Sequence, residues 1–387
     1  MAEGHVKITR RGADRVRSGH LWVYRSDVRS ADAEPGSVVR VADETGNFVG
    51  RAFFSSRSQI TLRFLTRDDV PVDRHFLAGR IRSAIEYRKR VVADTDAYRV
   101  VYGESDLLPS LVVDRYADWL VIQTLSQGTE QHKDEIVSIL QEALAPQGIL
   151  ERNDPRVREL EGLERRSSVV YGTVPEQLVA NQNGIQLLYD LRTGQKTGGF
   201  LDQRENHRAA REYASGEVLD CFSYHGGFAL TVAPSAAHVE AIDLSGPAIG
   251  VARRNQELNG MGNVSFVEAN SFDLLKSYDT SGRMFDAVVL DPPAFAKNRE
   301  SVSAAARGYK EINLRALKIL RPGGYLITCS CSYHISEALF LQLIAEAAND
   351  ARRNMQTVER RTQARDHPIL LTMPETHYLK CFIFRLV

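Results

Sequence analysis

The sequence predicts an α/β protein whose C-terminal half forms a doubly wound parallel sheet. From about residue 196 onward, short apolar segments alternate with amphipathic helical segments, as expected for strands joined by crossover helices. The first ~70 residues consist instead of short β-rich segments between turn signals, and the region between mixes strands and helices. A length of 387 residues favours two or three domains. We therefore expect domains over residues 1–74, 75–195 and 196–387.

Each region carries local signals for its elements. In the first, alternating β-formers predict strands over 38–43, 48–54 and 60–66. In the second, apolar residues three and four apart predict helices over 73–93 and 132–148, with strands around them. In the third, the predicted strands are 217–222, 238–244, 264–270, 285–291 and 323–331, and the predicted helices include 247–260 and 311–320.

Composition excludes several classes of protein. Hydrophobic residues make up 43% and charged residues 25% of the chain, which is ordinary for a globular protein. No apolar run approaches the roughly 18–20 residues that span a bilayer, and the first residues lack the apolar core of a secretory signal. We therefore expect a cytoplasmic protein without a membrane partner. The cysteines are too few and too scattered for a disulfide framework or a metal site, at Cys221, Cys329, Cys331 and Cys381.

The net charge is zero, but basic residues are concentrated locally. Residues 1–30 hold seven Lys or Arg against three acidic residues, a net of +4, and a second cluster comprises Arg80, Arg82, Arg88, Lys89 and Arg90. Such stripes are a typical footprint of phosphate binding. A solvated helix face explains either cluster about equally well.

Two carboxylates at predicted strand ends indicate a nucleoside cofactor. Asp220 ends the first strand of the doubly wound region, and Gly226 and Gly227 in the next loop permit close approach of a ligand. Asp243 ends the second strand, where a carboxylate accepts hydrogen bonds from ribose hydroxyls. The glycine spacing is not G-x-G-x-x-G, which argues against a nicotinamide cofactor.

Two further strand ends carry reactive or recognition groups. Asp291-Pro292-Pro293-x-Phe295 predicts a stiff loop that presents a carboxylate, carbonyl groups and an aromatic wall to a planar amine-bearing ring. Cys331 is a candidate nucleophile at the next strand end. Cys329 would face the same way if the strand persists, but a buried structural role is favoured for it.

A polar stretch precedes the first strand of the third region. It contains Asp202, Gln203, Arg204 and Asn206. Polar density beside a cofactor site suggests direct contact with the cofactor. The alternative is the start of a capped helix with Asp202 at or near the N-cap.

Taken together, these motifs resemble one family. KTGGFLDQREN, LDCFSYHGGF, DPPAFAK, RGYKEINLRAL, TCSCS and DHPILLTMPETHYLKCF occur in this order. They are similar to motifs of bacterial 23S ribosomal RNA cytosine-C5 methyltransferases with an N-terminal PUA domain, and the resemblance covers essentially the whole chain. It implies an RNA-binding PUA β-barrel, an α+β connector and a class I methyltransferase domain with a mostly parallel seven-stranded sheet. The implied cofactor is S-adenosylmethionine (SAM), without a metal. The implied partner is 23S rRNA, naked or in a precursor particle, and self-association as a homodimer is a hypothesis.

The resemblance also implies residue roles. Cys331 corresponds to the nucleophile that adds to cytosine C6, and Asp291 to the aspartate that engages the ring nitrogen. The expected cofactor-binding residues are Asp220, Phe222, Tyr224, Gly226, Asp243, Asn270, Ser271, Asp291, Gln203 and Arg204. The expected substrate-binding residues are Pro292, Pro293, Phe295, Lys297 and Tyr309.

Two departures leave alternatives open. Many RNA cytosine-C5 methyltransferases have a second cysteine where this chain has Pro293, so the base that removes the C5 proton is not identified. Asn270 stands where an acid often contacts adenine, and Asp273 is the alternative acid. The competing functions are uracil-C5 methylation, methylation of an exocyclic amine, and a non-catalytic RNA-binding assembly factor.

Overall fold

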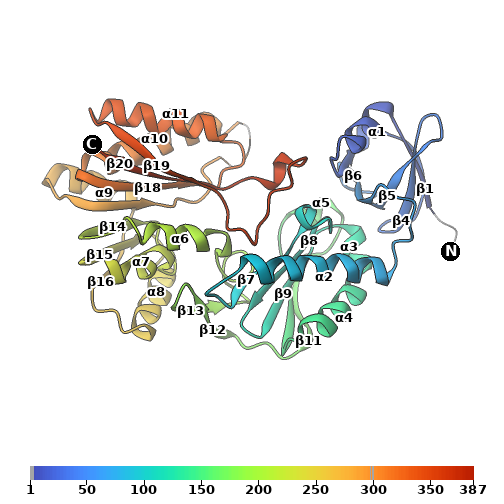
Figure 1. Cartoon of the computed structure of the whole chain (residues 1–387), viewed down its shortest axis with the longest axis horizontal. Coiled ribbons are helices and arrows are strands. Elements are labelled where there is room, and N and C mark those ends of the chain that lie inside the picture. Colours follow the sequence, from blue (N-terminus) through green and yellow to red (C-terminus); the bar gives the residue numbers. More distant parts are fainter. Residues whose placement is uncertain (1–3, 297, 299) are drawn as a thin grey trace. The chain divides into compact units, whose positions relative to one another are not determined.

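The computed structural model describes residues 4–296, 298 and 300–387. The chain forms two compact units (Figure 1). Unit 1 comprises Met1–Ala180, Tyr189–Leu201 and Arg365–Thr376, and unit 2 comprises Asn181–Leu188, Asp202–Ala364 and His377–Val387. The chain therefore crosses between the units five times, after residues 180, 188, 201, 364 and 376. The division into three domains stays a prediction.

Unit 1 begins with a six-stranded sheet in the order β2-β6-β5-β4-β1-β3. β1 and β4 are parallel, and the other neighbours are antiparallel. Thr9 caps the single α-helix of this part, since its hydroxyl accepts a hydrogen bond from Gly12 N at 3.1 Å. The three strands predicted here are confirmed as β4, β5 and β6. The elements are β1 (Gly4–Ile8), α1 (Arg10–Arg17), β2 (Trp22–Tyr24), β3 (Val28–Asp32), β4 (Val38–Asp43), β5 (Phe48–Phe54) and β6 (Ile60–Thr66).

A five-stranded sheet in the order β11-β10-β9-β8-β7 follows. Leu77 and Ile81 of α2 pack with Ile136 and Leu140 of α4 and with apolar residues of the strands, which forms one continuous core. Asp73 caps α2 by accepting from Phe76 N at 3.0 Å. The elements are α2 (Arg74–Val91), β7 (Ala97–Tyr102), β8 (Leu111–Tyr116), β9 (Trp119–Thr124), α3 (Gln127–Gln131), α4 (Lys133–Leu144), β10 (Gly148–Asn153), α5 (Val157–Leu160) and β11 (Arg166–Gly172).

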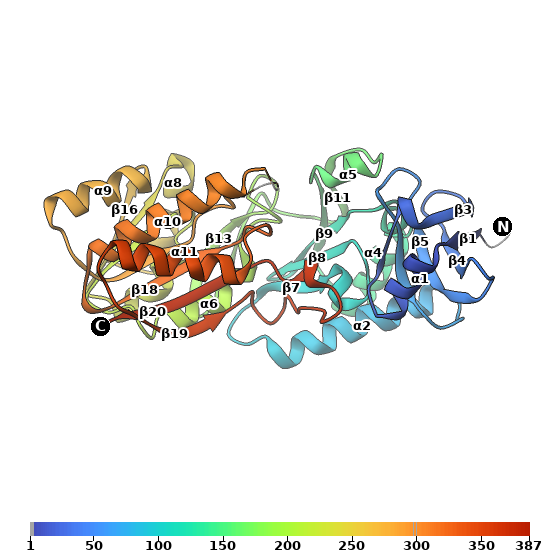
Figure 2. The ribbon, with the colours of Figure 1, turned by 90° about the horizontal axis from the view of Figure 1, so that it is seen from above.

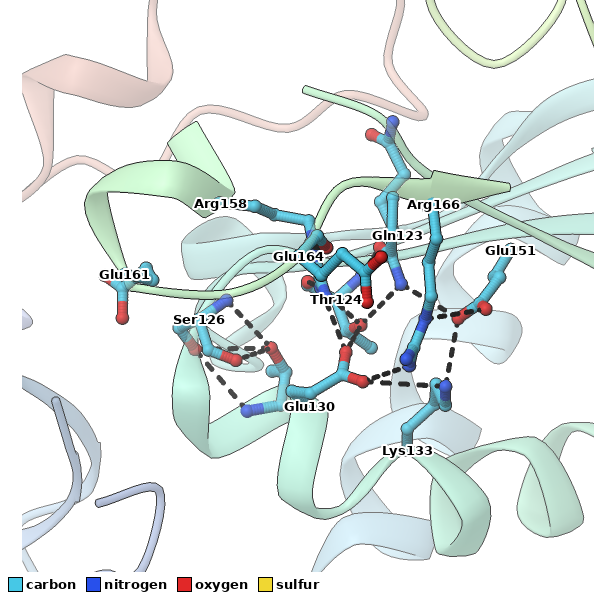
Figure 3. Close-up of polar contacts among 12 residues, drawn as sticks. Gln123, Thr124, Ser126, Glu130, Lys133, Glu151, Arg158, Glu161, Glu164 and Arg166 are labelled. Atoms are coloured by element: carbon cyan, nitrogen blue, oxygen red, sulfur yellow. Dashed lines mark hydrogen bonds and ion pairs between the residues drawn. The ribbon is translucent and has the colours of Figure 1, made fainter. Parts of the chain in front are cut away.

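A cluster of ion pairs lies within this sheet and its helices (Figure 3). Glu130 accepts from Arg158 Nη1 at 2.9 Å, and Glu151 accepts from Lys133 Nζ at 3.0 Å and from Arg166 Nε at 2.8 Å. Burial raises the pKa of Glu130 and of Glu151, but hydrogen bonds outweigh burial and bring both pKa values below the usual range. The charges of this cluster are thus compensated by one another, as buried charges need to be.

Segment Arg365–Thr376 returns to unit 1 and joins a second buried network. Arg88 is 1% exposed, and its Nη2 donates to Asp366 O at 2.7 Å while its Nη1 pairs with Asp106. The Asp366 carboxylate accepts from Arg99 N at 2.8 Å. Arg88 belongs to the second basic cluster in the sequence, and the hypothesis that it contacts phosphate is wrong because its guanidinium is buried and paired.

A two-stranded hairpin comes next in the chain, before the seven-stranded sheet of unit 2. Strands β12 (Gln177–Gln182) and β13 (Ile185–Asp190) pair across Asn183-Gly184. Both turn residues have positive φ, at 56° and 80°. This is the backbone of a type I′ turn, for which Asn-Gly is strongly preferred.

Unit 2 contains the predicted seven-stranded, mostly parallel sheet, in the order β16-β15-β14-β17-β18-β20-β19. The first five strands in this order are parallel, and β20 is antiparallel to both of its neighbours. The five predicted strands are confirmed. The strands are β14 (Glu217–Cys221), β15 (His238–Asp243), β16 (Val264–Glu268), β17 (Phe285–Leu290), β18 (Leu320–Ser330), β19 (Met355–Arg361) and β20 (Lys380–Leu386).

Helices cover both faces of this sheet (Figures 1 and 2). α10 and α11 lie on one side and α6, α7 and α8 on the other. The helices are α6 (Arg204–Ala210), α7 (Gly227–Val232), α8 (Gly246–Leu258), α9 (Ser271–Ser281), α10 (Val302–Lys318) and α11 (Glu337–Asp350). The helix predicted over 311–320 is longer at its start and shorter at its end, because Leu320 already begins β18. No helix in the described part of the chain is long and apolar enough to cross a membrane.

Candidate active site

The middle of the seven-stranded sheet is a topological switch point. β14 pairs with β15 on one side and with β17 on the other, and the order of strands runs outward from this pair in both directions. Ligands of doubly wound sheets bind outside the carboxyl ends of the strands at such a point. Asp220 and Asp243 lie at the ends of β14 and β15, and Asp291 directly follows β17. The fold thus brings the three predicted carboxylates to one edge of the sheet.

The loop after β14 has an unusual backbone. Phe222 and Tyr224 have φ values of 66° and 49°, in the left-handed region that residues with a Cβ rarely adopt. Gly226, with φ of 83°, directly precedes α7, and a Cβ there would lie 3.0 Å from the Phe266 ring. Backbone strain of this kind is concentrated at functional sites. The three residues are predicted cofactor ligands, and the loop places them together beside Asp220.

Asp220 is fully buried, with one carboxylate oxygen accepting from Ala229 N at 3.0 Å. Burial raises its pKa well above the usual range, and the nearby Asp291 and Asp243 add to the shift. Its other oxygen has no hydrogen-bond partner within the described chain, and neither has the buried hydroxyl of Ser223. Since buried polar groups are nearly always paired, these atoms fit a polar ligand such as SAM, whose amine and hydroxyls can donate.

Asp243 is held in position by the backbone. Its two oxygens accept from Tyr224 N and Ser245 N, both at 2.9 Å. A carboxylate oxygen accepts more than one hydrogen bond, so these contacts leave capacity for the ribose of a nucleoside. Asn270 is the N-cap of α9, accepting from Phe272 N at 2.9 Å, and Ser271 is the first residue of that helix. The role of both residues toward adenine stays a prediction.

Gln203 connects the polar stretch before β14 to the proline loop. Its Nε2 donates to Asp291 Oδ1 at 2.8 Å, and its Oε1 accepts from Asn206 Nδ2 at 2.6 Å. The acceptor end of the amide is therefore occupied by Asn206, so the donor end faces the carboxylate. The helix α6 begins at Arg204 with Gln203, not Asp202, at its N-cap position. Arg204 is buried beside Glu205 at 3.6 Å.

Cys331 lies directly after the last residue of β18 and is half-buried, whereas the other three cysteines, all described, are buried. Its Sγ lies 4.0 Å from the Pro292 carbonyl oxygen, which places the thiol against the proline loop. Cys329 is directly opposite Cys381 on β20. Burial raises the pKa of Cys329 well above the usual range, which keeps it a thiol. Because β18 ends at Ser330, the two cysteines do not form a continuous strand pattern.

Ser332 ties three segments together behind Cys331. Its hydroxyl accepts from Ala296 N at 3.1 Å and lies 2.9 Å from the Tyr309 hydroxyl on α10. Tyr309 is fully buried, and its pKa is raised by burial. Through Ser332, Tyr309 therefore supports the proline loop and the turn that carries Cys331. Its direct contact with substrate stays a prediction.

Aromatic rings continue from the β14 loop to the proline loop. Phe222 contacts Phe272, Phe272 contacts Phe295, and Phe295 contacts Tyr309, with ring centroids 6.4, 6.0 and 4.7 Å apart. Pro292 is buried and Pro293 is exposed. Lys297, a predicted substrate-binding residue, lies outside the described residues.

Sequence reasoning missed two residues beside Cys331. Ser332 follows the candidate nucleophile directly, but its role depends on Ala296 and on α10. Lys380, in the tail motif HYLKCF, is brought to this place by the pairing of β20 with β18, opposite Ser330. The adjacency of Lys380 to Cys331 in space has no signal in local sequence.

Many basic residues of the N-terminal stripe are paired within unit 1. Arg11 and Arg15 both contact Asp27, at 2.6 and 3.1 Å, and Arg17 contacts Asp43 at 2.6 Å. Hydrogen bonds from Thr45 and Arg17 lower the pKa of Asp43. Arg10, with a side chain 88% exposed, lies 3.7 Å from Asp14. Several cations of the stripe are thus partly neutralised by acidic partners, although the Arg11 side chain stays 68% exposed.

Comparison with known proteins places both ends of the chain in families. A PUA-like domain model matches residues 6–67, and an S-adenosylmethionine-dependent methyltransferase model matches residues 165–385. Proteins called ribosomal RNA large subunit methyltransferase I are similar over 95% of this chain. The protein from Erwinia tasmaniensis is 39% identical, with 96% of its own length covered, and that from Aeromonas hydrophila is 41% identical, with 95% covered.

Solved structures share the fold. SMU.776, solved as a complex with S-adenosylhomocysteine, superposes with a TM-score of 0.85 at 22% identity, over 98% of this chain and 99% of its own. A Streptococcus mutans structure gives a TM-score of 0.83 at 22% identity, with the same coverage. The matched families, the PUA-like domain and the sheet with its switch point agree. The chain belongs to the ribosomal RNA large subunit methyltransferase I family of S-adenosylmethionine-dependent methyltransferases.

Proposed function

We propose that this protein methylates large-subunit (23S) ribosomal RNA in the cytoplasm and forms 5-methylcytosine through a transient covalent bond between Cys331 and cytosine C6. The observation that carries the proposal is the position of Cys331. It is the half-buried cysteine, it follows a strand whose carboxyl end faces the switch point, and its Sγ lies 4.0 Å from Pro292 O. A thiol against the proline loop is suited to attack a base that this loop holds.

Asp291, from the same loop, is the proposed partner of the cytosine ring nitrogen. Its carboxylate is oriented by Gln203, so its position does not depend on the substrate. A preorganised group of this kind stabilises charge as it develops on the ring. The rings of Phe295 and Phe272 are suited to form an apolar wall beside the base.

The chemistry needs a nucleophile because cytosine C5 is poorly reactive by itself. When the Cys331 thiolate adds to C6, the S–C6 bond forms and the π electrons of C5–C6 make C5 enamine-like. SAM, when bound near Asp220 and Asp243, supplies an electrophilic methyl group. Loss of the C5 proton to a base then restores the double bond and expels the Cys331 thiolate.

The RNA substrate is proposed from the relatives' names and from the PUA-like domain. Exposed cations such as Arg10 are suited to phosphate contacts, which position a protein on RNA without reading its sequence. The rRNA, naked or in a precursor particle, is thus the proposed partner.

A trapping assay tests the covalent mechanism. The protein is incubated with SAM and with ribosomal RNA that contains 5-fluorocytosine. A base cannot remove the fluorine at C5 as it removes the proton of cytosine, so the covalent adduct persists. Cys331→Ala is compared with Cys329→Ala as a matched control two residues away. We expect a protein–RNA adduct with the native protein and with Cys329→Ala, and none with Cys331→Ala.

Other outcomes identify the competing functions. An adduct that survives in Cys331→Ala but not in Cys329→Ala assigns the nucleophile to Cys329. Trapping by 5-fluorouracil RNA alone indicates uracil-C5 methylation. Methyl transfer from labelled SAM without any adduct indicates an exocyclic amine as the acceptor, and no methyl transfer to any rRNA fraction indicates an assembly factor.

A further inference from the structure

Lys380 is a buried lysine beside the proposed nucleophile. It is the first residue of β20 and lies directly opposite Ser330, the last residue of β18. Its side chain is turned inward, with the residue only 4% exposed. Its Nζ donates to Ser332 O at 2.7 Å and to Tyr378 O at 2.8 Å. These two bonds use two of the three N–H groups of the ammonium and anchor it to the peptide that follows Cys331.

The ammonium has no carboxylate partner among the described residues, since its contacts there are the two carbonyl oxygens and no Asp or Glu oxygen lies within 4.0 Å of Nζ. Two acidic groups attract the ammonium of Lys380: Cys331 and, more weakly, Glu337 in the first turn of α11. Burial lowers the pKa of Lys380 to about 8, against the opposing attraction of these two groups. A buried cation without an anion is costly, so a nearby negative charge would stabilise the ammonium.

The other titratable groups described near Cys331 carry no positive charge. Tyr309, from α10, has a pKa raised by burial and is therefore a neutral phenol at physiological pH. Cys329 and Cys381 are buried on β18 and β20, and burial together with its neighbour Cys381 raises the pKa of Cys329. Asp291 follows β17, and its carboxylate is held by Gln203. Among these groups only Lys380 contributes positive charge.

We propose that Lys380 is a positioning residue that holds Cys331 as a thiolate and anchors the turn that carries it. This inference rests on the proposed role of Cys331 as the nucleophile. The thiol proton passes to solvent, Lys380 keeps its own protons, and the ion pair forms before RNA binds. The thiolate is the reactive form of cysteine, so Lys380 sets the pH above which Cys331 is able to attack C6.

A purely structural role is the alternative. The two carbonyl contacts would then close the turn at Ser332 without affecting the thiol. The two roles differ in one measurable property, the pH at which Cys331 ionises, since an opposite charge within about 4–6 Å favours the ionised form.

The test measures the rate of iodoacetamide alkylation of Cys331 against pH, in the full-length protein without RNA. The other three cysteines are buried, and peptide mass spectrometry identifies the labelled one. We compare the native protein with Lys380→Met, which removes the charge, Lys380→Arg, which keeps it, and Arg385→Met, a control at an exposed residue of the same strand.

We expect the pH midpoint of alkylation to rise by about one unit in Lys380→Met, with alkylation at neutral pH about tenfold slower. The midpoint should stay near the native value in Lys380→Arg and in Arg385→Met. An unchanged midpoint in a Lys380→Met protein that still binds SAM by calorimetry overturns the inference. If Lys380→Met does not fold, the native protein decides it: a midpoint no lower than that of the urea-unfolded chain overturns the inference as well.

The alkylation assay does not depend on methyl transfer, so the two proposals fail separately. In one case, the pH midpoint of Cys331 alkylation in the native protein is lower than in the unfolded chain, but no RNA adduct is trapped. This result refutes cytosine-C5 chemistry and leaves the Lys380–Cys331 pair in place. A trapped adduct together with an unchanged midpoint in Lys380→Met supports the chemistry and refutes the role of Lys380.

Discussion

Gln203 and Asp291 are 88 residues apart in the sequence and share a 2.8 Å hydrogen bond at the switch point of the sheet. Asn206 occupies the other end of the Gln203 amide and so fixes its orientation. The family resemblance implies that Gln203 contacts the cofactor, whereas its partner in the structure is Asp291, the carboxylate proposed to engage cytosine.

We therefore expect Gln203→Leu to slow methyl transfer by about 10- to 100-fold, because a hydrogen bond to a charged group contributes roughly 1.5–3 kcal/mol. The affinity for SAM, measured by calorimetry, should change much less than the rate. Equal losses in rate and in SAM affinity would show that Gln203 is a cofactor ligand after all.

Asp220 should control cofactor affinity. Because one of its oxygens is buried and has no partner in the described chain, we expect Asp220→Leu to weaken SAM binding by at least about tenfold. Asp220→Asn keeps an acceptor for Ala229 N and resembles the protonated acid that the raised pKa favours. The loss of SAM affinity in this variant should therefore be smaller than in Asp220→Leu. Calorimetric titration with SAM measures both, and equal affinities for the native protein and Asp220→Leu would contradict the assignment.

His207 should make unit 2 sensitive to acid. Its ring is buried against Phe228, with centroids 4.4 Å apart, and its Nδ1 lies 3.0 Å from Gln182 Nε2. Burial lowers its pKa from 6.5 to about 3. As the pH falls, the imidazole is protonated at a higher pH in the unfolded chain than in the folded protein. The contribution of His207 to the free energy of unfolding is therefore fully present above pH 6.5 and is lost as the pH falls from 6.5 toward 3. Between pH 7 and pH 5 this amounts to about 2 kcal/mol.

The matched variant is His207→Asn, which keeps an acceptor near Gln182 but does not titrate. It should be less stable at pH 7, with a weaker dependence on pH between 7 and 5. The stability of unit 2 is measured by amide hydrogen exchange in α7. Tryptophan fluorescence does not report on unit 2, because Trp22 and Trp119 both lie in unit 1. Parallel pH profiles for the two proteins would refute the role of His207.

Arg10 and Arg88 form a matched pair for RNA binding, since one guanidinium is exposed and the other is buried. We expect Arg10→Ala to reduce the dependence of rRNA affinity on salt by about one unit of slope, as loss of one phosphate contact does. Arg88→Met should leave that slope unchanged and destabilise unit 1 by about 3–5 kcal/mol, because the buried Asp106 carboxylate loses its ion-pair partner. The opposite pattern in filter binding at several salt concentrations would restore Arg88 as an RNA contact.

The five parallel strands of unit 2 were predictable because they are short apolar runs, whereas β19, with the sequence MQTVERR, and β20 were not among the predicted strands. A carboxylate or cysteine at the end of each run, such as Asp220, Asp291 or Cys331, then falls at one edge by the geometry of parallel strands. The partners of these residues were not predictable. Gln203 with Asp291, and Lys380 with Ser330, meet through pairing over long sequence distances, which local periodicity does not encode.

Burial of charged residues was equally hidden from the sequence. Arg88 occurs within a run of basic residues, and although helical spacing places it on the same face as Ile81 and Ile85, its charged side chain did not indicate burial. Its burial depends on Asp366, 278 residues later. The Asn183-Gly184 turn shows the opposite case, since its dipeptide specifies the hairpin locally.

The return of Arg365–Thr376 to unit 1 has a consequence for biosynthesis. Arg88 and Arg99 complete their hydrogen bonds only with Asp366, so a network that begins at residue 88 is complete only once residue 366 has been made. During translation, unit 1 holds a buried guanidinium without one of its acceptors until about residue 366 has left the ribosome. Domains usually mature in order from the N-terminus as the chain is made, whereas here unit 1 completes its buried network only after residues 202–364 of unit 2 have been made.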